Sequence, residues 1–180
     1  MKRLILVCGA NGIGKSTACR NLVEIFPPSA YIDSDYCRFM NPFSFSKEEV
    51  AVVVSNISNM MINYFKLDTI GNVIFQYGFH GVRRQIFKEI LALLDENRIE
   101  YEFCPIILEC SLEENIRRMQ NDGRDSERIN RAIENTRDIY DELPYPRINV
   151  THLSPEQTAF KIKEMLEKHT FSTRYRFEAE

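Results

Sequence analysis

The sequence predicts an α/β fold in which helices cover both faces of a parallel β-sheet. Five short apolar runs alternate with windows of helical periodicity along the 180 residues. The runs span Leu4–Cys8, Ala30–Ile32, Asn72–Phe75, Phe103–Leu108 and Ile148–Val150. Strands that alternate with helices need right-handed crossovers, which sandwich a parallel sheet between helices. The chain length fits one domain with a core of its own.

Apolar residues recur at spacings of three and four between the predicted strands, which is the period of a helix. The clearest window runs from Val50 to Phe65, and two others cover 82–94 and 129–139. Helix starts carry the capping-box pattern, in which a serine is followed three residues later by Glu or Gln. The three candidates are Ser46, Ser111 and Ser154, the last with Pro155 at the first helical position.

The polar stretch 120–128, which contains Gly123, is the candidate for a mobile lid. We expect one domain over residues 1–169. Residues 170–180 show no clear period, so they are expected to form a C-terminal tail that either frays or docks.

Composition limits the function classes. The formal net charge is −3 and the pI is about 5.7, which argues against a nonspecific nucleic-acid binder, since such proteins are usually basic. Five cysteines without a C-x-x-C pair fit neither a disulfide framework nor a zinc site, so we expect a reduced, cytoplasmic protein. The N-terminal apolar run Leu4–Cys8 is too short for a signal peptide, and no apolar stretch has the length of a membrane span.

A glycine-rich motif joins the first predicted strand to the helical window that follows it. Its sequence is Gly9-Ala10-Asn11-Gly12-Ile13-Gly14-Lys15-Ser16, which matches the phosphate-binding pattern G-x-x-x-x-G-K-[ST]. Glycines let backbone N–H groups turn inward to form an anion-binding nest, and the following helix points its positive end at the same place. A chance match in a loop is the alternative, but three of the seven glycines cluster here. We therefore predict an ATP-binding P-loop.

Phosphate chemistry assigns roles within this loop. Lys15 would reach the β- and γ-phosphates, and the Ser16 hydroxyl would bind Mg²⁺. The residues expected to contact ATP are Gly9, Asn11, Gly12, Ile13, Gly14, Lys15, Ser16 and Thr17. ATP and Mg²⁺ are therefore the expected cofactors. No N-K-x-D motif of GTPases and no L-S-G-G-Q motif of transporter ATPases is present.

Two carboxylates follow the second predicted strand, in the segment Asp33-Ser34-Asp35. Ligands bind at the carboxyl edge of open parallel sheets, and positions i and i+2 of an extended segment point to the same side. One carboxylate could therefore hold Mg²⁺ or its water while the other accepts a proton from a substrate hydroxyl. A turn rich in Asp and Ser is the alternative interpretation.

With these motifs in place, the chain resembles the small P-loop kinases, a superfamily that includes shikimate, gluconate and nucleotide kinases. The resemblance covers residues 3–168 in the order and length of the elements. Its specific parts are the loop at 9–17, the Asp33-Ser34-Asp35 segment, the arginines near 118–124 and the segment Asn149–Ile162. It implies a P-loop NTP hydrolase fold with a five-stranded parallel sheet, a small lid and an acceptor-binding region at about 36–66.

The same resemblance implies roles for individual residues. Asp33 would lie on the metal side, and Asp35 would be the base toward the acceptor. Arg118 and the Ser154-Pro155 segment would lie against the adenine, and Arg124 would move onto the transferring phosphate, with Arg128 as a second candidate. For these arginines a solvated basic helix face is the alternative, and for Ser154-Pro155 it is simple helix capping.

The third strand departs from many relatives, because it runs into Gln76 instead of a carboxylate. In this respect the chain is similar to uncharacterised bacterial ATP-binding proteins and to tunicamycin-resistance ATP-binding proteins. The predicted acceptor pocket contains Asp35, Tyr36, Arg38, Gln76 and His80, and it would suit a flat, polar or anionic acceptor. Further members of this region are Phe39, Met40, Asn41, Phe43 and the rest of the segment from Gln76 to Arg83.

We therefore expect an ATP-dependent kinase that transfers the γ-phosphate to a small nucleoside, nucleotide or other alcohol. An ATP-dependent small-molecule binding or resistance protein without transfer is the alternative. A polynucleotide kinase is a weaker alternative, because the net charge of the chain is negative. The expected partners are ATP and a small-molecule acceptor. We expect no membrane association, consider nucleic acid binding unfavoured, and expect a monomer or a homodimer.

Overall fold

A computed structural model describes residues 1–168 and 171, and these form one five-stranded parallel sheet with helices on both faces. The strands are β1 (Arg3–Gly9), β2 (Ser29–Asp33), β3 (Asn72–Gln76), β4 (Glu102–Glu109) and β5 (Arg147–Asn149). The α-helices are α1 (Lys15–Ile25), α2 (Lys47–Lys66), α3 (Arg83–Glu96), α4 (Leu112–Asn121), α5 (Ser126–Thr136) and α6 (Pro155–Lys168). Short 3₁₀ turns lie at η1 (Tyr36–Arg38) and η2 (Asp138–Tyr140). The predicted α/β class is confirmed.

The spatial order of the strands is β2-β3-β1-β4-β5, and every pairing is parallel. β1 is central, because it pairs with β3 from Arg3 to Val7 and with β4 from Arg3 to Gly9. The second and third strands therefore lie on one side of β1, and the fourth and fifth lie on the other. In open parallel sheets, ligands bind outside the carboxyl ends of strands where the order reverses, which here is the end of β1.

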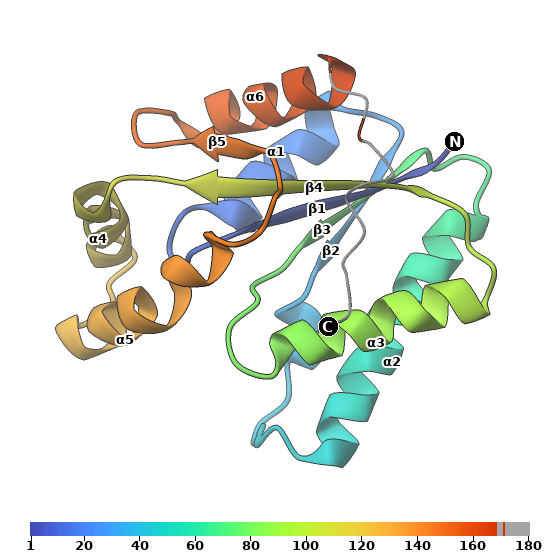
Figure 1. Ribbon diagram of the computed structural model, residues 1–180, viewed down its shortest axis with the longest axis horizontal. Helices are drawn as coiled ribbons and strands as arrows, with labels where there is room; N and C mark the ends of the chain where they lie inside the picture. The colour runs from blue at the N-terminus through green and yellow to red at the C-terminus, as the bar shows by residue number, and fades with distance from the viewer. Residues whose placement is uncertain (169–170, 172–180) are drawn as a thin grey trace.

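Two apolar layers hold the helices on the sheet (Figure 1). Helices α2 and α3 cover one face, where Ile57, Phe75 and Phe87 are buried together. Helices α1 and α6 cover the other face, around Leu22 and Ile162. Central strands buried on both faces read as continuous apolar runs, which explains why β1, β3 and β4 are apparent in the sequence.

The predicted capping boxes differ in completeness. Ser46 and Ser154 each accept from the backbone three residues on, and the Glu49 and Gln157 side chains accept from the Ser46 and Ser154 backbone N–H groups. Ser111 caps α4 by accepting from the Glu114 backbone, but the Glu114 carboxylate binds arginines instead of completing the box.

The stretch predicted as a lid, 120–128, is the end of α4, a turn and the start of α5. Helix α5 begins at Ser126 because the Asp125 side chain accepts from the Arg128 backbone N–H, 2.8 Å away. Together α4 and α5 form a small cluster of their own around Met119 and Ile129, beyond the carboxyl ends of the strands (Figure 1).

Within the described residues, no helix combines the length and the apolar composition that a bilayer crossing requires. The predicted tail at 170–180 lies outside the described residues, except for Phe171, which is buried in the layer of α1 and α6.

Candidate active site

The P-loop lies between the end of β1 and the start of α1, as the motif predicts. Its glycines have positive φ angles, 139° at Gly9 and 77° at Gly12. They also allow close approaches: a Cβ atom at Gly9 would lie 2.3 Å from the Leu108 carbonyl oxygen, and one at Gly12 would lie 2.2 Å from Met119 Cγ. Any other residue would displace the β4 backbone if placed at Gly9 and the Met119 side chain if placed at Gly12.

Helices α4 and α5 brace the loop from outside through three hydrogen bonds. The Asn115 amide donates to the Asn11 carbonyl at 2.9 Å, and the Asn11 N–H donates to the Thr136 hydroxyl at 3.0 Å. Arg118 Nη1 donates to the Ile13 carbonyl at 2.8 Å. Because all three partners belong to the predicted lid or its flanks, the loop conformation depends on where these helices sit.

Lys15 is buried at the floor of the loop. Its Nζ donates to the carbonyls of Gly9 and Ala10, both at 2.9 Å, which leaves a third hydrogen for a ligand. Burial lowers the pKa of Lys15 from 10.5 to about 8, because the charged form loses its hydration. The site therefore holds a partly destabilised cation that an anionic ligand would stabilise.

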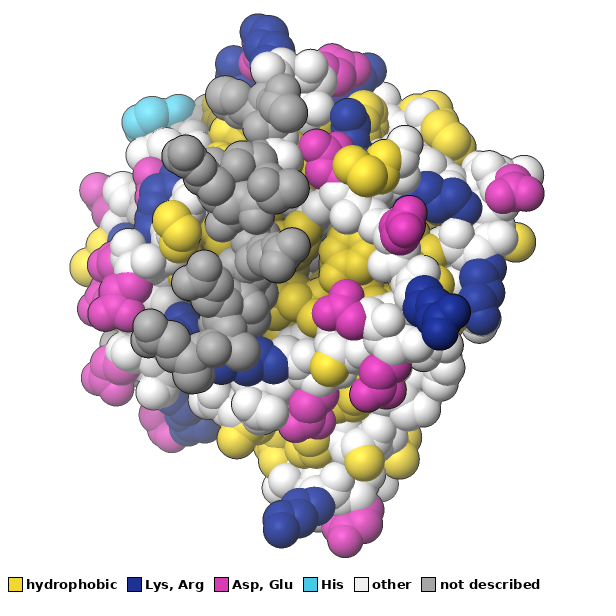
Figure 2. All heavy atoms as spheres, turned by 45° about the vertical axis from the view of Figure 1, so that its right-hand side comes forward, with side chains coloured by type: hydrophobic (Ala, Val, Ile, Leu, Met, Phe, Trp, Pro, Cys, Tyr) yellow, Lys and Arg dark blue, Asp and Glu magenta, His cyan; other side chains and the backbone are white. Residues whose placement is uncertain are grey.

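A cleft of about 800 Å³ opens from the P-loop, and its charge opposes that of the whole protein. Seven basic and three acidic side chains line it, although the formal net charge of the chain is −3. The basic residues are Lys15, Arg38, Arg83, Arg117, Arg118, Arg124 and Arg128, and the acidic ones are Asp35, Glu114 and Asp122. Basic and acidic side chains are mixed on the face shown in Figure 2. A cleft with such an excess attracts multiply charged anions.

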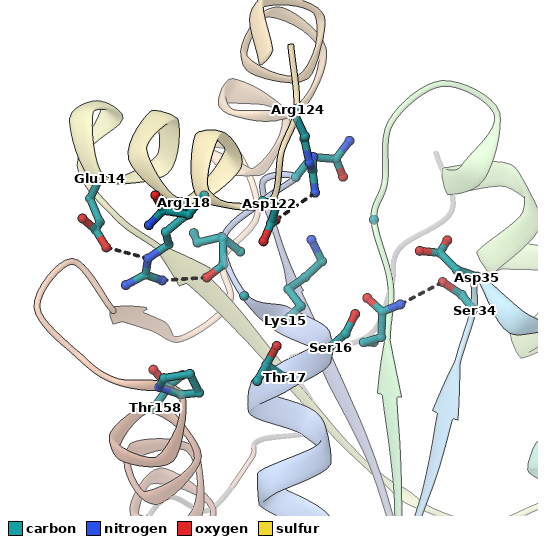
Figure 3. Close-up of a pocket in the computed structure, with 18 of the residues that line it drawn as sticks. Lys15, Ser16, Thr17, Ser34, Asp35, Glu114, Arg118, Asp122, Arg124 and Thr158 are labelled. Atoms are coloured by element: carbon teal, nitrogen blue, oxygen red, sulfur yellow. Dashed lines mark hydrogen bonds and ion pairs between the residues drawn. The ribbon is translucent and has the colours of Figure 1, made fainter. Parts of the chain in front are cut away.

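One end of the cleft lies between α4 and the start of α6. Two hydrogen bonds fix the position of the Arg118 guanidinium there, one to Glu114 Oε1 at 2.7 Å and one to the Val150 carbonyl at 2.6 Å. Hydrogen bonds from Arg117 and Arg118 lower the pKa of Glu114 to about 2. Pro155 and Thr158 line the same cleft, and Figure 3 shows Thr158 facing Arg118 across the space beside Thr17.

The other end of the cleft holds Asp35, across from Lys15 and Ser16 in Figure 3. Arg38 Nη2 lies 2.6 Å from Asp35 Oδ1, and Arg83 Nη2 lies 3.7 Å from the same oxygen. Partial burial acts to raise the pKa of Asp35, but the hydrogen bond and charge of Arg38, together with the charges of Arg83 and Lys15, outweigh it and lower the pKa. Asp35 is therefore ionised and able to accept a hydrogen bond.

The expectation that Asp33 and Asp35 face the same side is wrong. β2 ends at Asp33 and the chain then turns into η1, so the alternation of an extended strand does not reach Asp35. Asp33 and Tyr36 line a second cleft of about 620 Å³ beside Arg20, not the cleft of the P-loop. The Tyr36 side chain, predicted in the acceptor pocket, is largely exposed there.

Gln76, at the end of β3, binds Asp33. Its Nε2 donates to Asp33 Oδ1 at 2.6 Å, and Tyr31 donates to Asp33 Oδ2 at 3.0 Å. The Asp33 carboxylate is thus occupied by neighbours from β2 and β3. Gln76 lines the main cleft as predicted, and so do Arg38 and His80.

Of the lid arginines, Arg124 and Arg128 both line the cleft, and Arg124 lies 3.5 Å from Asp122. Of the residues expected to contact ATP, Gly9 does not line the cleft, whereas the P-loop from Asn11 to Thr17 does.

Arg83 ends the segment that is predicted to line the acceptor pocket, and the sequence motifs give it no separate role. It lies on the buried face of α3 with Ile86, Phe87, Ile90 and Leu94. An arginine at the helical spacing of an apolar face is therefore the pattern in the sequence that indicates a buried charge.

No model of a known protein family matches this chain, and no curated protein does. Solved structures match over nearly the whole length. The tunicamycin resistance protein of Deinococcus radiodurans superposes with a TM-score of 0.65 at 15% identity, covering 92% of this chain and 96% of that one. The Mycobacterium tuberculosis APS kinase, in complex with AMPPNP and APS, gives 0.60 at 18% identity, covering 93% and 98%.

The shikimate kinase of Acinetobacter baumannii, in complex with shikimate, gives a TM-score of 0.59 at 16% identity, covering 94% of this chain and 97% of that one. Similarity at this level of identity establishes the fold. The predicted five-stranded parallel architecture and the resemblance stated from the motifs are confirmed at that level, and the chain has the fold of the small P-loop kinases.

Proposed function

We propose that this protein binds ATP with Mg²⁺ and transfers the γ-phosphate to a small acceptor. The observation that carries the proposal is one basic cleft with the P-loop and Lys15 on one side and an ionised Asp35 on the other. A volume of about 800 Å³ fits a nucleotide together with a small second molecule.

The P-loop residues fit a nucleotide triphosphate. Backbone N–H groups around Gly12 and Gly14 form the cradle, and α1 directs its positive end to the same point. Lys15 would donate its third hydrogen to a phosphate oxygen. At the far end, Arg118 uses its edge groups on protein acceptors, so its flat face would remain to stack on adenine near Pro155.

Mg²⁺ fits this cleft only as a partner of the phosphates. Among residues 1–168 and 171, no cluster of three or more His, Cys, Asp or Glu side chains is arranged to hold a metal ion. Mg²⁺ usually keeps several waters and binds through few protein ligands plus substrate phosphates, where it neutralises negative charge. The Ser16 hydroxyl would supply one ligand, whereas Asp33, which lines the second cleft and accepts from Gln76, would supply none.

Transfer would depend on positioning more than on strong base catalysis. Phosphoryl transfer passes through a loose transition state, so proton removal from the acceptor is not the main demand. The lowered pKa of Asp35 makes it a weak base but a reliable hydrogen-bond acceptor for a hydroxyl. Arg124 and Arg128 would neutralise charge on the moving phosphate, for which Arg124 has to leave Asp122.

An ATP-dependent binding protein without transfer is the second candidate function. Two observations favour it: β3 ends in Gln76 and not in a carboxylate, and one structural neighbour is a tunicamycin resistance protein. Such a protein would need the nucleotide end of the cleft but not an ionised Asp35.

Nucleotide binding is tested first, by thermal unfolding with ATP and Mg²⁺. A hundredfold excess of ATP over its dissociation constant should stabilise the protein by about 2.7 kcal/mol. Lys15→Ala should remove this stabilisation, and Lys163→Ala, in the part of α6 outside the cleft lining, should keep it. The proposal fails if ATP gives no stabilisation or if Lys15→Ala leaves it intact.

Asp35→Asn separates the two functions in a γ-phosphate transfer screen across sugars, nucleosides and aminoglycoside-like alcohols. We expect turnover to fall by roughly 10- to 100-fold, because a hydrogen bond to a charged group is lost, while the affinity for ATP is kept. Asp68→Asn, at an exposed position after α2, is the matched control. Tight ATP binding with no turnover in the wild type, and no effect of Asp35→Asn on ligand capture, would favour the binding protein.

A further inference from the structure

The Arg83 guanidinium is buried without a full set of partners. Its side chain is 7% exposed, and Nη2 has no hydrogen-bond partner among the described residues. The nearest carboxylate oxygen, Asp35 Oδ1, lies 3.7 Å from Nη2, beyond hydrogen-bond distance. The position is rigid, because Tyr77 donates to the Arg83 backbone carbonyl at 3.1 Å and the guanidinium lies 5.8 Å from the centre of the Tyr77 ring.

An arginine cannot relieve burial by losing its proton under ordinary conditions, so this charge costs stability in the free protein. Buried donors are normally paired, and an exception inside a cleft indicates a group that a ligand completes. Arg83 lines the main cleft, so Nη2 is available to a molecule bound there.

The surroundings of Arg83 favour an oxyanion. Two guanidinium groups, those of Arg38 and Arg83, face one carboxylate, that of Asp35, so one positive charge stays uncompensated. His80 lines the same region with a buried Nδ1 that lacks a partner in the described part of the chain. Burial and the nearby arginines lower the pKa of His80 to about 4, so its ring is neutral and adds no charge.

We propose that Arg83, with Arg38 beside it, binds an oxyanion group of the acceptor, so that the acceptor is a small hydroxylated anion. The bound group is a carboxylate or a phosphate, since both match the planar fork of a guanidinium. The inference rests on the proposed function, because it assigns the acceptor class of the same cleft. A neutral sugar or a free nucleoside could accept a hydrogen bond from Arg83, but it would leave the positive charge uncompensated.

Arg83 and the P-loop come from different elements of the fold. Arg83 begins α3 after β3 and approaches Asp35, whereas the P-loop and Lys15 end β1 and begin α1. The acceptor would place its hydroxyl against Asp35 and its oxyanion against Arg83. Arg83 is thus a specificity-determining residue on the acceptor side.

The test is isothermal titration of the full chain saturated with a non-hydrolysable ATP analogue and Mg²⁺, which fills all three phosphate positions. The probes are inorganic phosphate, acetate and glycerol, which represent the phosphate, the carboxylate and a neutral alcohol. The variants are Arg83→Gln, Arg83→Lys and the matched control Arg84→Gln, which removes the same charge one residue away and outside the cleft lining.

We expect phosphate or acetate to bind the wild type and the control, and glycerol not to bind. Arg83→Gln should weaken anion binding by about 10- to 100-fold, since hydrogen bonds to charged groups are lost, and Arg83→Lys should be intermediate. The tighter of the two anions identifies the group. Without ligand, Arg83→Gln should raise the melting temperature, because it removes an uncompensated buried charge.

The inference is overturned if neither anion binds the wild type, or if Arg83→Gln and Arg84→Gln bind anions equally well. It is also overturned if Arg83→Gln lowers the melting temperature with anion affinity unchanged, which indicates a structural role, or if it abolishes binding of the ATP analogue itself. Failure of the analogue to bind the wild type contradicts the proposed function, and the anion titration of nucleotide-free protein then still decides the role of Arg83.

Once an acceptor pair supports turnover, the KM values provide a second readout. Sugar acids and sugar phosphates should be phosphorylated in preference to the matching neutral sugars. Arg83→Gln should raise KM for the anionic acceptor by about 10- to 100-fold and leave KM for ATP unchanged. Preference for the neutral sugar, or an equal rise for both substrates, contradicts the inference.

Discussion

Replacing Asn115 with alanine tests whether helix α4 holds the P-loop in its binding conformation. The Asn115 side chain is 1% exposed, donates to the Asn11 carbonyl at 2.9 Å and accepts from Arg137 Nη1 at 3.2 Å. Alanine removes both interactions and leaves the Asn11 carbonyl without this donor. The substitution therefore acts on the loop without replacing a residue that is itself expected to bind nucleotide.

The magnitude follows from those two contacts. Each hydrogen bond contributes about 1 kcal/mol, and a buried group left unsatisfied costs about 1–3 kcal/mol. We therefore expect the free energy of unfolding to fall by about 2–4 kcal/mol, from a total of about 5–15 kcal/mol for a domain. For a chain of this size the melting temperature should fall by roughly 5–15 °C.

The assay is chemical and thermal unfolding, followed by titration with an ATP analogue. Asn135→Ala is the matched control, since that amide is exposed and bonds only to the Arg131 carbonyl on its own helix. The control should change stability by less than about 0.5 kcal/mol. Equal stability losses in the two variants, or full nucleotide affinity in Asn115→Ala, would show that α4 does not brace the loop.

Three further predictions concern the same cleft. Gln76→Glu places a second carboxylate against Asp33, and the repulsion raises the pKa of one of the two groups. At pH values between the ordinary carboxyl pKa and the raised pKa, the folded state therefore binds one proton more than the unfolded state. The variant should therefore lose about 2 kcal/mol at pH 8 and recover most of it near pH 5, whereas a loss independent of pH excludes charge repulsion. Lys15 has a pKa of about 8 and must be protonated to bind phosphate, so the affinity for ATP should fall above pH 8. Calorimetric titration in buffers of different ionisation enthalpy should detect proton uptake on binding. Absence of proton uptake at pH 8 would contradict the lowered pKa. Gly12→Ala should cost about 1–3 kcal/mol more than Gly123→Ala, since both have positive φ angles but only Gly12 faces a side chain at 2.2 Å; equal costs would refute a steric role.

The strands and the P-loop could be read from the sequence because their signals are local. An apolar run such as Leu4–Cys8 is buried on both faces, and the glycine spacing of the loop carries its own geometry. The spatial order of the strands could not be read in the same way, because parallel pairing joins residues such as Arg3 and Glu102 that lie far apart in the chain.

The site was predictable where one element decides the position of a side chain. Lys15 and Ser16 lie where the motif places them, but Asp33 and Asp35 separate because a turn follows Asp33. The sequence shows Arg83 in phase with the apolar face of its helix, but its contacts with Tyr77 and Asp35 exist only in the folded chain.

The five cysteines, which carry no expected function, provide a way to watch the domain open. All are buried, with Cys8 and Cys37 in the layer of α2 and α3 and Cys19, Cys104 and Cys110 in the layer of α1 and α6. Burial raises the pKa of every one of these thiols, to about 12 for Cys8, so labelling reagents that need the thiolate react only after local unfolding. The order in which they are labelled would show which face of the sheet loses its helices first, and whether a bound nucleotide slows both faces or only the one under α1.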